Sequence, residues 1–435
     1  MPDQPNILVI LADDLGYGDL SCCGRDDLET PYLDGLASDG MMLTDFHSNG
    51  AVCSPTRASL LTGRYPQRAG IETALSKNDP GLPRAETTVA DVLGGSGYST
   101  AIYGKWHLGD RLENNPVHYG FDDFRGHTYG DSDYISHVDR HGDVDWWHNL
   151  EIENEDGYNT RLLTDYALRF IADHREDPFF LLLSHSAIHF PWMTPDDPGH
   201  RKPGTDYTSW RSDMPRTYSK LGPHEDVGPV VRVMIEELDA STGRVIQGLR
   251  ERGLEENTLV FFISDNGGYL HYGGLHRGEI SSNGPLRGQK GDAYEGGHRV
   301  PAIAYWPGRI EHGVSSETSL TMDLLPTFLE VAGLGHGAGR ALDGVSLLPL
   351  LEEGEPLRER DVFWRHRQKR GARRGSWKMI RVGDQAPELY DLGEDVGERD
   401  DVALDHPDIV REMETSLTGW EGDVRQGTGR QPARG

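Results

Sequence analysis

Near its start the chain reads Asn6-Ile7-Leu8-Val9-Ile10-Leu11-Ala12, a continuous apolar run that ends in Asp13-Asp14. Such a run is typical of a parallel strand that other elements cover on both faces. Two carboxylates at the end of a buried strand cost free energy unless they are hydrogen-bonded or bound to a metal ion. A lone Asp in this place would indicate a solvated loop, but a pair that follows a hydrophobic strand indicates a functional site.

Other apolar runs alternate with helical patterns along most of the chain. We predict further strands over residues 99–103, 178–183, 257–263 and 302–306, and helices over 30–40, 88–93, 159–173, 230–252 and 323–332. This alternation implies an α/β fold in which a mostly parallel sheet carries helices on both faces.

Polar side chains follow four of the predicted strands. In open sheets of this kind, ligands bind beyond the carboxyl ends of the strands. Lys105 and His107 are two residues apart in a predicted extended segment, so their side chains can point the same way. We expect the strand ends to form one site, which contains Asp13, Asp14, Lys105, His107, His189, Asp265 and Asn266.

Three segments depart from this alternation. Residues 120–160 show no clear periodicity, which indicates a long functional loop or a small hairpin, and residues 195–225 indicate a surface excursion. The apolar density falls beyond about Glu352, where short antiparallel strands and a terminal helix are predicted. We therefore expect two domains, residues 1–355 and 356–435, with a frayed tail from about Glu421.

The composition is strongly acidic. The 435 residues contain 71 Asp and Glu against 43 Lys and Arg, a formal net charge of -28. Nucleic acid and anionic membrane surfaces are therefore poor partners. No run is long enough to span a membrane, and no basic leader precedes the first strand, so we expect a cytoplasmic protein. Three cysteines exclude a disulfide framework.

A second informative stretch reads Cys53-Ser54-Pro55-Thr56-Arg57-Ala58-Ser59-Leu60-Leu61-Thr62-Gly63-Arg64. Pro55 suits the first turn of a helix and Gly63 suits its end, so Cys53 is expected at a helix N-terminus. A thiol next to unpaired N–H groups, with Arg57 one turn on, favours chemistry and anion binding. The alternative is a buried Cys beside a structural Arg.

Spacing weighs against two other functions for Cys53. A tyrosine-phosphatase loop needs five residues between Cys and Arg, and this chain has only Ser54, Pro55 and Thr56 there. A structural zinc site needs paired cysteines with ligand spacing, but the other two, Cys22 and Cys23, are adjacent and nothing nearby completes a tetrahedral set.

The pattern C-x-P-[ST]-R followed by L-L-T-G-R resembles the signature of the type I sulfatases. The resemblance extends in order along nearly the whole chain, through Ala12-Asp13-Asp14-Leu15-Gly16, Thr30-Pro31-x-Leu33-Asp34, Gly104-Lys105-Trp106-His107-Leu108-Gly109, Ser264-Asp265-Asn266-Gly267-Gly268, Asn283-Gly284-Pro285-Leu286-Arg287-Gly288-x-Lys290-Gly291, Glu295-Gly296-Gly297 and Glu388-Leu389-Tyr390-Asp391-Leu392. It implies an alkaline-phosphatase-like α/β sandwich with a small C-terminal antiparallel sheet domain, and an arylsulfatase or carbohydrate sulfatase activity.

The resemblance also implies the site. Cys53 is oxidised to formylglycine, whose hydrated aldehyde is the nucleophile, and a formylglycine-generating enzyme is the partner that this requires. Oxygen ligands fit a hard cation, Ca²⁺ or alternatively Mg²⁺. The implied metal ligands are Asp13, Asp14, residue 53, Asp265 and Asn266; Arg57 and Lys105 hold the hydrate, His107 takes its second proton, and His189 and Lys290 bind sulfate oxygens and protonate the leaving alcohol.

The resemblance implies that the substrate is a sulfated small molecule or saccharide. The segment Asp133-Tyr134-x-x-His137, with Gly142, Trp147 and Asn149, resembles a loop of arylsulfatase B-like and N-acetylgalactosamine-sulfatase-like members, which favours a sulfated sugar. Trp146 and Trp147 could stack on a pyranose or serve as packing anchors. Two alternatives stay open: a phosphonate monoester hydrolase or phosphodiesterase of the same superfamily, and a non-catalytic binding protein on this fold.

Overall fold

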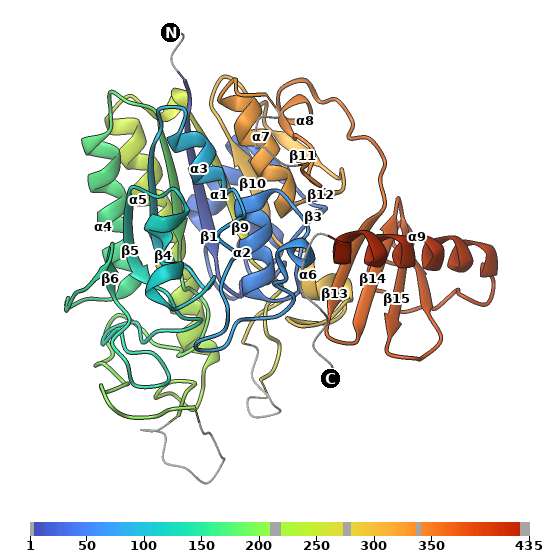
Figure 1. Cartoon of the computed structure of the whole chain (residues 1–435), viewed down its shortest axis with the longest axis horizontal. Coiled ribbons are helices and arrows are strands. Elements are labelled where there is room, and N and C mark those ends of the chain that lie inside the picture. The colour runs from blue at the N-terminus through green and yellow to red at the C-terminus, as the bar shows by residue number, and fades with distance from the viewer. Residues whose placement is uncertain (1–3, 209–218, 273–279, 336–340, 427–435) are drawn as a thin grey trace.

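The computed structural model describes residues 4–208, 219–272, 280–335 and 341–426 (Figure 1). Within these residues ten strands form one sheet. Their order across it is β11 (Gly313–Ser315), β2 (Met41–Leu43), β10 (Ala302–Tyr305), β9 (Thr258–Ser264), β1 (Asn6–Ala12), β8 (Phe179–Ser184), β4 (Ser99–Lys105), β5 (Asp123–His127), β6 (Trp147–His148) and β7 (Glu151–Ile152).

The middle of this sheet is parallel, as predicted. β1 pairs in parallel with β8 on one side and β9 on the other, so that Ile10 lies between Leu183 and Phe262. β4 continues the parallel set between β8 and β5. β10 runs antiparallel to β9. Because five neighbouring strands run in one direction, their carboxyl ends share one edge of the sheet.

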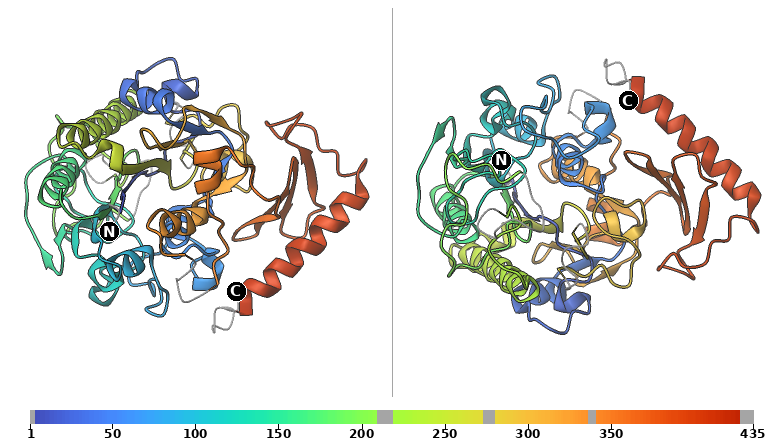
Figure 2. Two further views of the ribbon diagram at one scale, coloured as in Figure 1. Left: turned by 90° about the horizontal axis from the view of Figure 1, so that it is seen from above. Right: turned by 90° about the horizontal axis from the view of Figure 1, so that it is seen from below.

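Helices cover both faces of the sheet (Figure 2). Alternate residues of β1 enter two separate cores: Leu8 and Ile10 pack with α1 (Pro31–Asp39), α4 (Asn159–Asp173) and α5 (Gly228–Glu251), whereas Ile7, Val9 and Leu11 pack with α2 (Cys53–Thr62), α3 (Val89–Gly94), α7 (Leu324–Val331) and α8 (Leu348–Glu353). Each such aliphatic side chain contributes about 1.5–3 kcal/mol by its burial. This explains the continuous apolar run in the sequence.

A second sheet stands beside the first (Figures 1 and 2). Its four antiparallel strands in the described part of the chain are β13 (Val362–His366), β14 (Lys369–Arg374), β15 (Trp377–Val382) and β16 (Glu388–Asp391). α9 (Pro407–Gln426) packs on it through Met413, Leu417 and Trp420. All of these elements fall within residues 356–435. The prediction of a frayed tail from about Glu421 is wrong for residues 421–426, because they belong to α9. Residues 427–435 lie outside the described residues.

The segment 120–160 contains one element that the sequence analysis missed. β5 is a parallel strand of the main sheet, whereas β6 and β7 form the small hairpin that was one of the two expectations. The alternation in β5 is hidden because its residues, Asp123-Phe124-Arg125-Gly126-His127, are mostly polar. Gly126 lies so close to β4 that a Cβ there would stand 2.2 Å from the carbonyl oxygen of Gly104.

Several short elements complete the chain: β3 (Phe46–His47), which pairs with β12 (Ser319–Leu320), and α6 (Glu295–His298). In the predicted excursion, the described residues 195–208 and 219–225 contain no helix or strand, and residues 209–218 lie outside the described part. No helix among the described residues is both long and apolar enough to cross a membrane.

Candidate active site

Cys53 is the first residue of α2, as the sequence predicts. Val52 caps this helix in an extended conformation without a side-chain hydrogen bond, and Gly63 ends it with a φ of 65°. Cys53 is only 2% exposed. Its thiol therefore lies in the interior at the positive end of a helix, where negative charge is stabilised.

A cluster of oxygen atoms lies beside this thiol, at the ends of β1 and β9. One ligand atom from each of Asp13, Cys53 and Asp265 lies within 4.8 Å of the others, and the same holds for Asp13, Asp14 and His189. Three buried oxygen atoms of the cluster have no hydrogen-bond partner: Asp13 Oδ1, Asp14 Oδ2 and Asn266 Oδ1.

These unpartnered oxygens fit a bound cation. Buried polar atoms are nearly always hydrogen-bonded, so three exceptions in one place call for a ligand. Burial raises the pKa of Asp13 and of Asp265 even though Lys105 and Arg57 lie beside them, and a bound cation would favour their charged forms. A hard divalent cation takes such carboxylate and amide oxygens as ligands.

Three basic side chains from distant parts of the chain already contact this cluster. Arg57 donates from Nε and Nη2 to Asp265 Oδ2, at 3.1 and 2.9 Å, and from Nη1 to the Lys105 carbonyl oxygen at 2.8 Å. Lys105 Nζ lies 2.5 Å from Asp13 Oδ2, and Lys290 Nζ donates to Asp14 Oδ1. Although burial opposes it, Asp14 holds the pKa of Lys290 well above its usual range, so this lysine stays charged.

His107 presents an unprotonated ring nitrogen. Its Nε2 lies 3.0 Å from the Leu75 carbonyl oxygen, and because a carbonyl only accepts, Nε2 carries the proton. Nδ1 is buried without a hydrogen-bond partner. Burial and the nearby Lys105 lower the pKa of His107 to about 3, so the ring is neutral. Its φ of 52° shows that the segment is not extended here, which corrects the reason given for expecting Lys105 and His107 on one side.

His189 is fixed in the opposite tautomer. Its Nδ1 donates to the Phe190 carbonyl oxygen at 2.6 Å, and its Nε2 faces Asp14 Oδ2 at 3.8 Å. Tyr134 holds this loop, because its hydroxyl lies 2.5 Å from the Ser186 carbonyl oxygen and 3.0 Å from that of His189. Burial, together with Lys105 and Lys290, lowers the pKa of His189 well below its usual value.

A cavity of about 670 Å³ opens above these groups. Cys53, His107, His189 and Lys290 line it, while the carboxylates, Arg57 and Lys105 lie beneath its floor. The structure thus brings all of the predicted site residues together. The sequence analysis missed most of the rest of the wall, which includes Tyr129, Arg140, Tyr269, Tyr272 and the turn 366–369.

The two tryptophans of the 120–160 segment do not line this cavity. Trp146 is 1% exposed, stacks on His137 with ring centroids 4.0 Å apart, and lies 3.1 Å from Glu155 through Nε1. Trp147 donates from Nε1 to Asp145 at 2.7 Å. They are packing anchors, which was one of the two alternatives.

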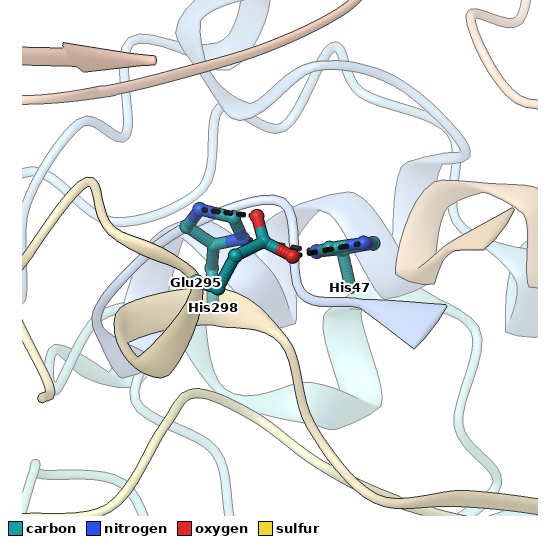
Figure 3. A group of neighbouring side chains, drawn as sticks. All are labelled: His47, Glu295 and His298. Carbon is teal, nitrogen blue, oxygen red and sulfur yellow. Dashed lines mark hydrogen bonds and ion pairs between the residues drawn. The ribbon is translucent and has the colours of Figure 1, made fainter. Parts of the chain in front are cut away.

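A second group of potential metal ligands, His47, Glu295 and His298, is buried, and Figure 3 shows these three side chains close together. Lys378 of β15 already contacts it, with Nζ 2.8 Å from both Glu295 Oε1 and His298 Nε2. His298 Nε2 also lies 3.2 Å from the Ala293 carbonyl oxygen, and His298 Nδ1 lies 3.0 Å from His47 Nδ1, so both ring nitrogens of His298 already have protein partners. We therefore assign this group a structural role.

Replacing Lys378 with methionine is expected to destabilise the protein by about 1–3 kcal/mol, because it removes the shortest ion pair of the buried Glu295 and leaves Oε1 without that donor, while Arg299 and Arg373 still pair with Oε2 at 3.4 and 3.5 Å. The matched control is Arg381→Met on the same strand, whose pair with Glu414 spans 3.5 Å between side chains 39% and 37% exposed. That change is expected to cost less than about 1 kcal/mol. Urea denaturation measures both, and equal losses would contradict the assignment.

Two known protein families match most of the length of this sequence. The family described as Sulfatase matches residues 5–334, and the family described as N-sulphoglucosamine sulphohydrolase, C-terminal, matches residues 289–421. The chain belongs to the sulfatase family. It is a sulfuric ester hydrolase, and members of this family generally use a bound metal ion and formylglycine.

Individual proteins of similar sequence are also sulfatases. N-acetylgalactosamine-6-sulfatase of Sus scrofa is 36% identical over 386 residues, which cover 83% of this sulfatase and 69% of that protein. Arylsulfatase A of Homo sapiens is 37% identical over 372 residues, which cover 80% and 68%.

Solved structures share the fold. Ps i-CgsB in complex with k-i-k-neocarrahexaose superposes with a TM-score of 0.84 at 28% identity, covering 98% of this sulfatase and 94% of that chain. The phosphonate monoester hydrolase of Agrobacterium radiobacter superposes with a TM-score of 0.67 at 19% identity, over 97% and 96%. The expected alkaline-phosphatase-like fold is therefore confirmed, and at this identity the second likeness concerns the fold alone.

Proposed function

We propose that this sulfatase removes a sulfate ester from a sulfated saccharide, with formylglycine derived from Cys53 as the nucleophile. The observation that carries the proposal is the place of Cys53, at a helix N-terminus in the wall of the cavity and within 4.8 Å of ligand atoms of Asp13 and Asp265. The saccharide is supported by two relatives, an N-acetylgalactosamine-6-sulfatase and a protein whose structure was solved in complex with k-i-k-neocarrahexaose.

The proposed cation is Ca²⁺, with Mg²⁺ as the alternative. Asp13, Asp14, Asp265 and Asn266 would hold it together with residue 53, and the three unpartnered oxygens support this set. Such an ion supplies Lewis acidity and offsets negative charge on the reacting oxygens. The second group of potential ligands, around Glu295, lacks comparable unpartnered oxygens among the described residues.

Arg57 and Lys105 position residue 53 and balance the charge around it. Arg57 lies one turn after Cys53 on α2 and is fixed at three of its nitrogens, so it presents a rigid positive charge. A hydrated aldehyde at position 53 supplies one hydroxyl that attacks sulfur and a second hydroxyl whose deprotonation releases sulfate. A thiol or a serine hydroxyl lacks that second group.

His107 is the proposed base for the second hydroxyl. Its Nδ1 is unprotonated and has no hydrogen-bond partner, and the bond from Nε2 to the Leu75 carbonyl oxygen fixes the direction of the ring. A neutral imidazole held in this way can accept a proton at Nδ1. His189 and Lys290 line the same cavity. The Lys290 ammonium would bind sulfate oxygens, and His189, once it has taken a proton at Nε2 beside the anionic substrate, would bind them too and deliver that proton to the leaving alcohol.

Replacing His107 with alanine is expected to lower steady-state turnover about 10²–10⁴-fold, the usual contribution of a positioned acid or base. Attack and alcohol release do not need His107, so the variant should release one equivalent of alcohol per active site and then stall. Rapid-mixing kinetics with 4-nitrophenyl sulfate would measure this burst. The control is His312→Ala at an exposed position. Loss of the burst along with turnover would place His107 in the attack step instead.

The proposed function is tested by measuring release of inorganic sulfate from 4-nitrophenyl sulfate and from sulfated saccharides, with 4-nitrophenyl phenylphosphonate as the competing substrate class. We expect kcat/KM to be higher for sulfate esters than for the phosphonate ester. A preference for the phosphonate would support the phosphonate hydrolase alternative, and no cleavage of any ester by protein that carries formylglycine would support a binding protein.

A formylglycine-generating enzyme is the partner that this proposal requires, because Cys53 must lose its thiol before the first turnover. Cys53 lies 2% exposed in the folded chain. We therefore propose that the modification precedes the completion of folding, when the segment around Pro55 and Arg57 is accessible. The cytoplasmic location expected from the sequence stays a prediction.

A further inference from the structure

The charge of the cavity wall is opposite to that of the protein as a whole. The chain has 71 Asp and Glu against 43 Lys and Arg. Among the described residues that line the cavity there is no Asp or Glu, but there are four basic side chains, Arg140, Lys290, Arg367 and Lys369. In an acidic protein such a wall concentrates positive charge at one place, which favours anionic ligands.

One sulfate ester does not account for all of this charge. Lys290 is next to the sulfate end of the cavity, because its Nζ contacts Asp14 in the floor. Of the other three basic residues, Arg140 comes from the 120–160 segment, whereas Arg367 and Lys369 lie at the turn between β13 and β14. Lys369 is neutralised by Asp292, and it also donates to the Gly291 carbonyl oxygen at 3.1 Å, so it ties the β13–β14 turn to the loop of Lys290.

Arg140 is a rigid and incompletely paired cation. Its Nε donates to Asp131 Oδ1 at 2.6 Å, and its guanidinium lies 5.3 Å from the ring centroid of Phe190, the residue after His189. Asp131 is shared with a second arginine, Arg201, whose Nη2 lies 2.5 Å from Oδ2. The single negative charge of Asp131 is therefore shared by two guanidinium groups. The pair of arginines keeps one uncompensated positive charge, and Arg140 is the member of this pair that lines the cavity.

Arg367 supplies a second surplus charge from the other sheet. It occupies the turn between β13 and β14 with a φ of 53°, and its side chain is exposed. Within the described part of the chain it has no ion pair or side-chain hydrogen bond. The residues on either side of the turn, His366 and Lys369, also line the cavity, so this turn forms part of the wall.

From these contacts we infer that the cavity selects substrates with a second anionic group, a carboxylate or another sulfate ester, held by Arg140 together with Arg367 of the β13–β14 turn. The inference rests on the proposed function, since it assigns the reacting sulfate to Cys53 and Lys290. A volume of about 670 Å³ lies within the range of about 300–1,000 Å³ that is usual for ligand pockets. It leaves room for groups beyond the reacting sulfate.

The test separates binding from hydrolysis. Titration calorimetry in a Cys53→Ala background, where no turnover occurs, would give the Kd of N-acetylgalactosamine 6-sulfate, of the 4,6-disulfate, and of the 6-sulfate linked to glucuronate. The second and third ligands distinguish a sulfate from a carboxylate as the second anion. Hydrolysis of 4-nitrophenyl sulfate by the protein with Cys53 intact tests the proposed function separately.

We expect at least one of the two dianionic ligands to bind about tenfold more tightly than the 6-sulfate, since a charge-assisted hydrogen bond is worth about that factor. Arg140→Gln and Arg367→Gln should each reduce this ratio, and the Arg367 change lies in an exposed turn that tolerates it. The control is Arg370→Gln on β14, which pairs with Glu421 at 2.9 Å and does not line the cavity. It should leave the ratio unchanged.

Two results would overturn the inference. One is equal affinity for all three ligands in the starting protein, and the other is a preference that persists in both Arg140→Gln and Arg367→Gln. A preference that disappears in these variants while no sulfate ester is cut would instead support the anion site and remove the proposed function.

Discussion

Replacement of Cys53 by serine is expected to lower the turnover of sulfate esters by at least about 10⁴-fold, the scale seen when an enzyme loses its nucleophile. The serine keeps one hydroxyl at the start of α2, among the groups that surround Cys53. It can accept a sulfate once, but it has no second hydroxyl whose deprotonation expels that sulfate. The variant should therefore stall after a single reaction, with sulfate bound to residue 53.

Steady-state and rapid-mixing kinetics with 4-nitrophenyl sulfate would measure both effects. The chain offers its own matched controls in Cys22→Ser and Cys23→Ser, since these half-buried cysteines lie outside the residues that line the cavity. Both controls should retain turnover. Multiple turnovers by Cys53→Ser at the rate of the starting protein would contradict the proposed release step.

Removal of the divalent cation is expected to produce the second largest effect. Chelation should lower kcat/KM by at least about 100-fold, because a catalytic metal ion contributes several kcal/mol of charge stabilisation. Ca²⁺ should restore activity, and the comparison with Mg²⁺ tests the choice between the two ions. The physical reason is the cluster of buried oxygens, in which Asp13 Oδ1, Asp14 Oδ2 and Asn266 Oδ1 lack hydrogen-bond partners.

Thermal unfolding gives a readout that does not depend on activity. A cation that binds only the folded chain stabilises it by about 2.7 kcal/mol at a hundredfold excess over its Kd, so the unfolding temperature should rise when Ca²⁺ is added. Asp13→Asn should abolish this rise. Asp408→Asn, at a side chain that is 82% exposed, is the matched control and should keep it. An unchanged unfolding temperature in the starting protein would exclude a tightly bound ion at these residues.

Much of the architecture could be predicted because most of the central strands are continuous apolar runs in the sequence. β1, β8 and β9 are apolar without interruption, since both of their faces lie in a core. β5 escaped prediction because three of its five residues are charged or histidine, and its close contact with β4 depends on Gly126. A strand such as β5, which forms because it pairs with β4 and not because its own residues are apolar or alternate, cannot be recognised from its sequence alone.

The floor of the site could be predicted for a topological reason. Parallel strands end at one edge, so polar residues that follow β1, β4, β8 and β9 in the sequence must meet in space. Arg57 and Cys53 then follow from the helix signals of Pro55 and Gly63. The reason given for His107 was nevertheless wrong, because its backbone is in the left-handed region rather than extended.

The cavity wall could not be predicted from the sequence. Arg140 belongs to a segment without periodicity. Its proposed role in binding a second anion depends on Asp131, which it shares with Arg201, and Arg201 lies 61 residues after Arg140 in the chain. Arg367 belongs to the second sheet, and it reaches the cavity only because that sheet packs beside the first. Packing between distant segments has no local pattern, so only the structure could bring these residues to the site.

Mass spectrometry of the proteolytic peptide that contains Cys53, from protein made in its own host, tests the central claim most directly. The account predicts an aldehyde in place of the thiol at residue 53, which would establish the nucleophile. A peptide that carries unmodified cysteine in every molecule, from protein that nevertheless turns over sulfate esters, would contradict the account.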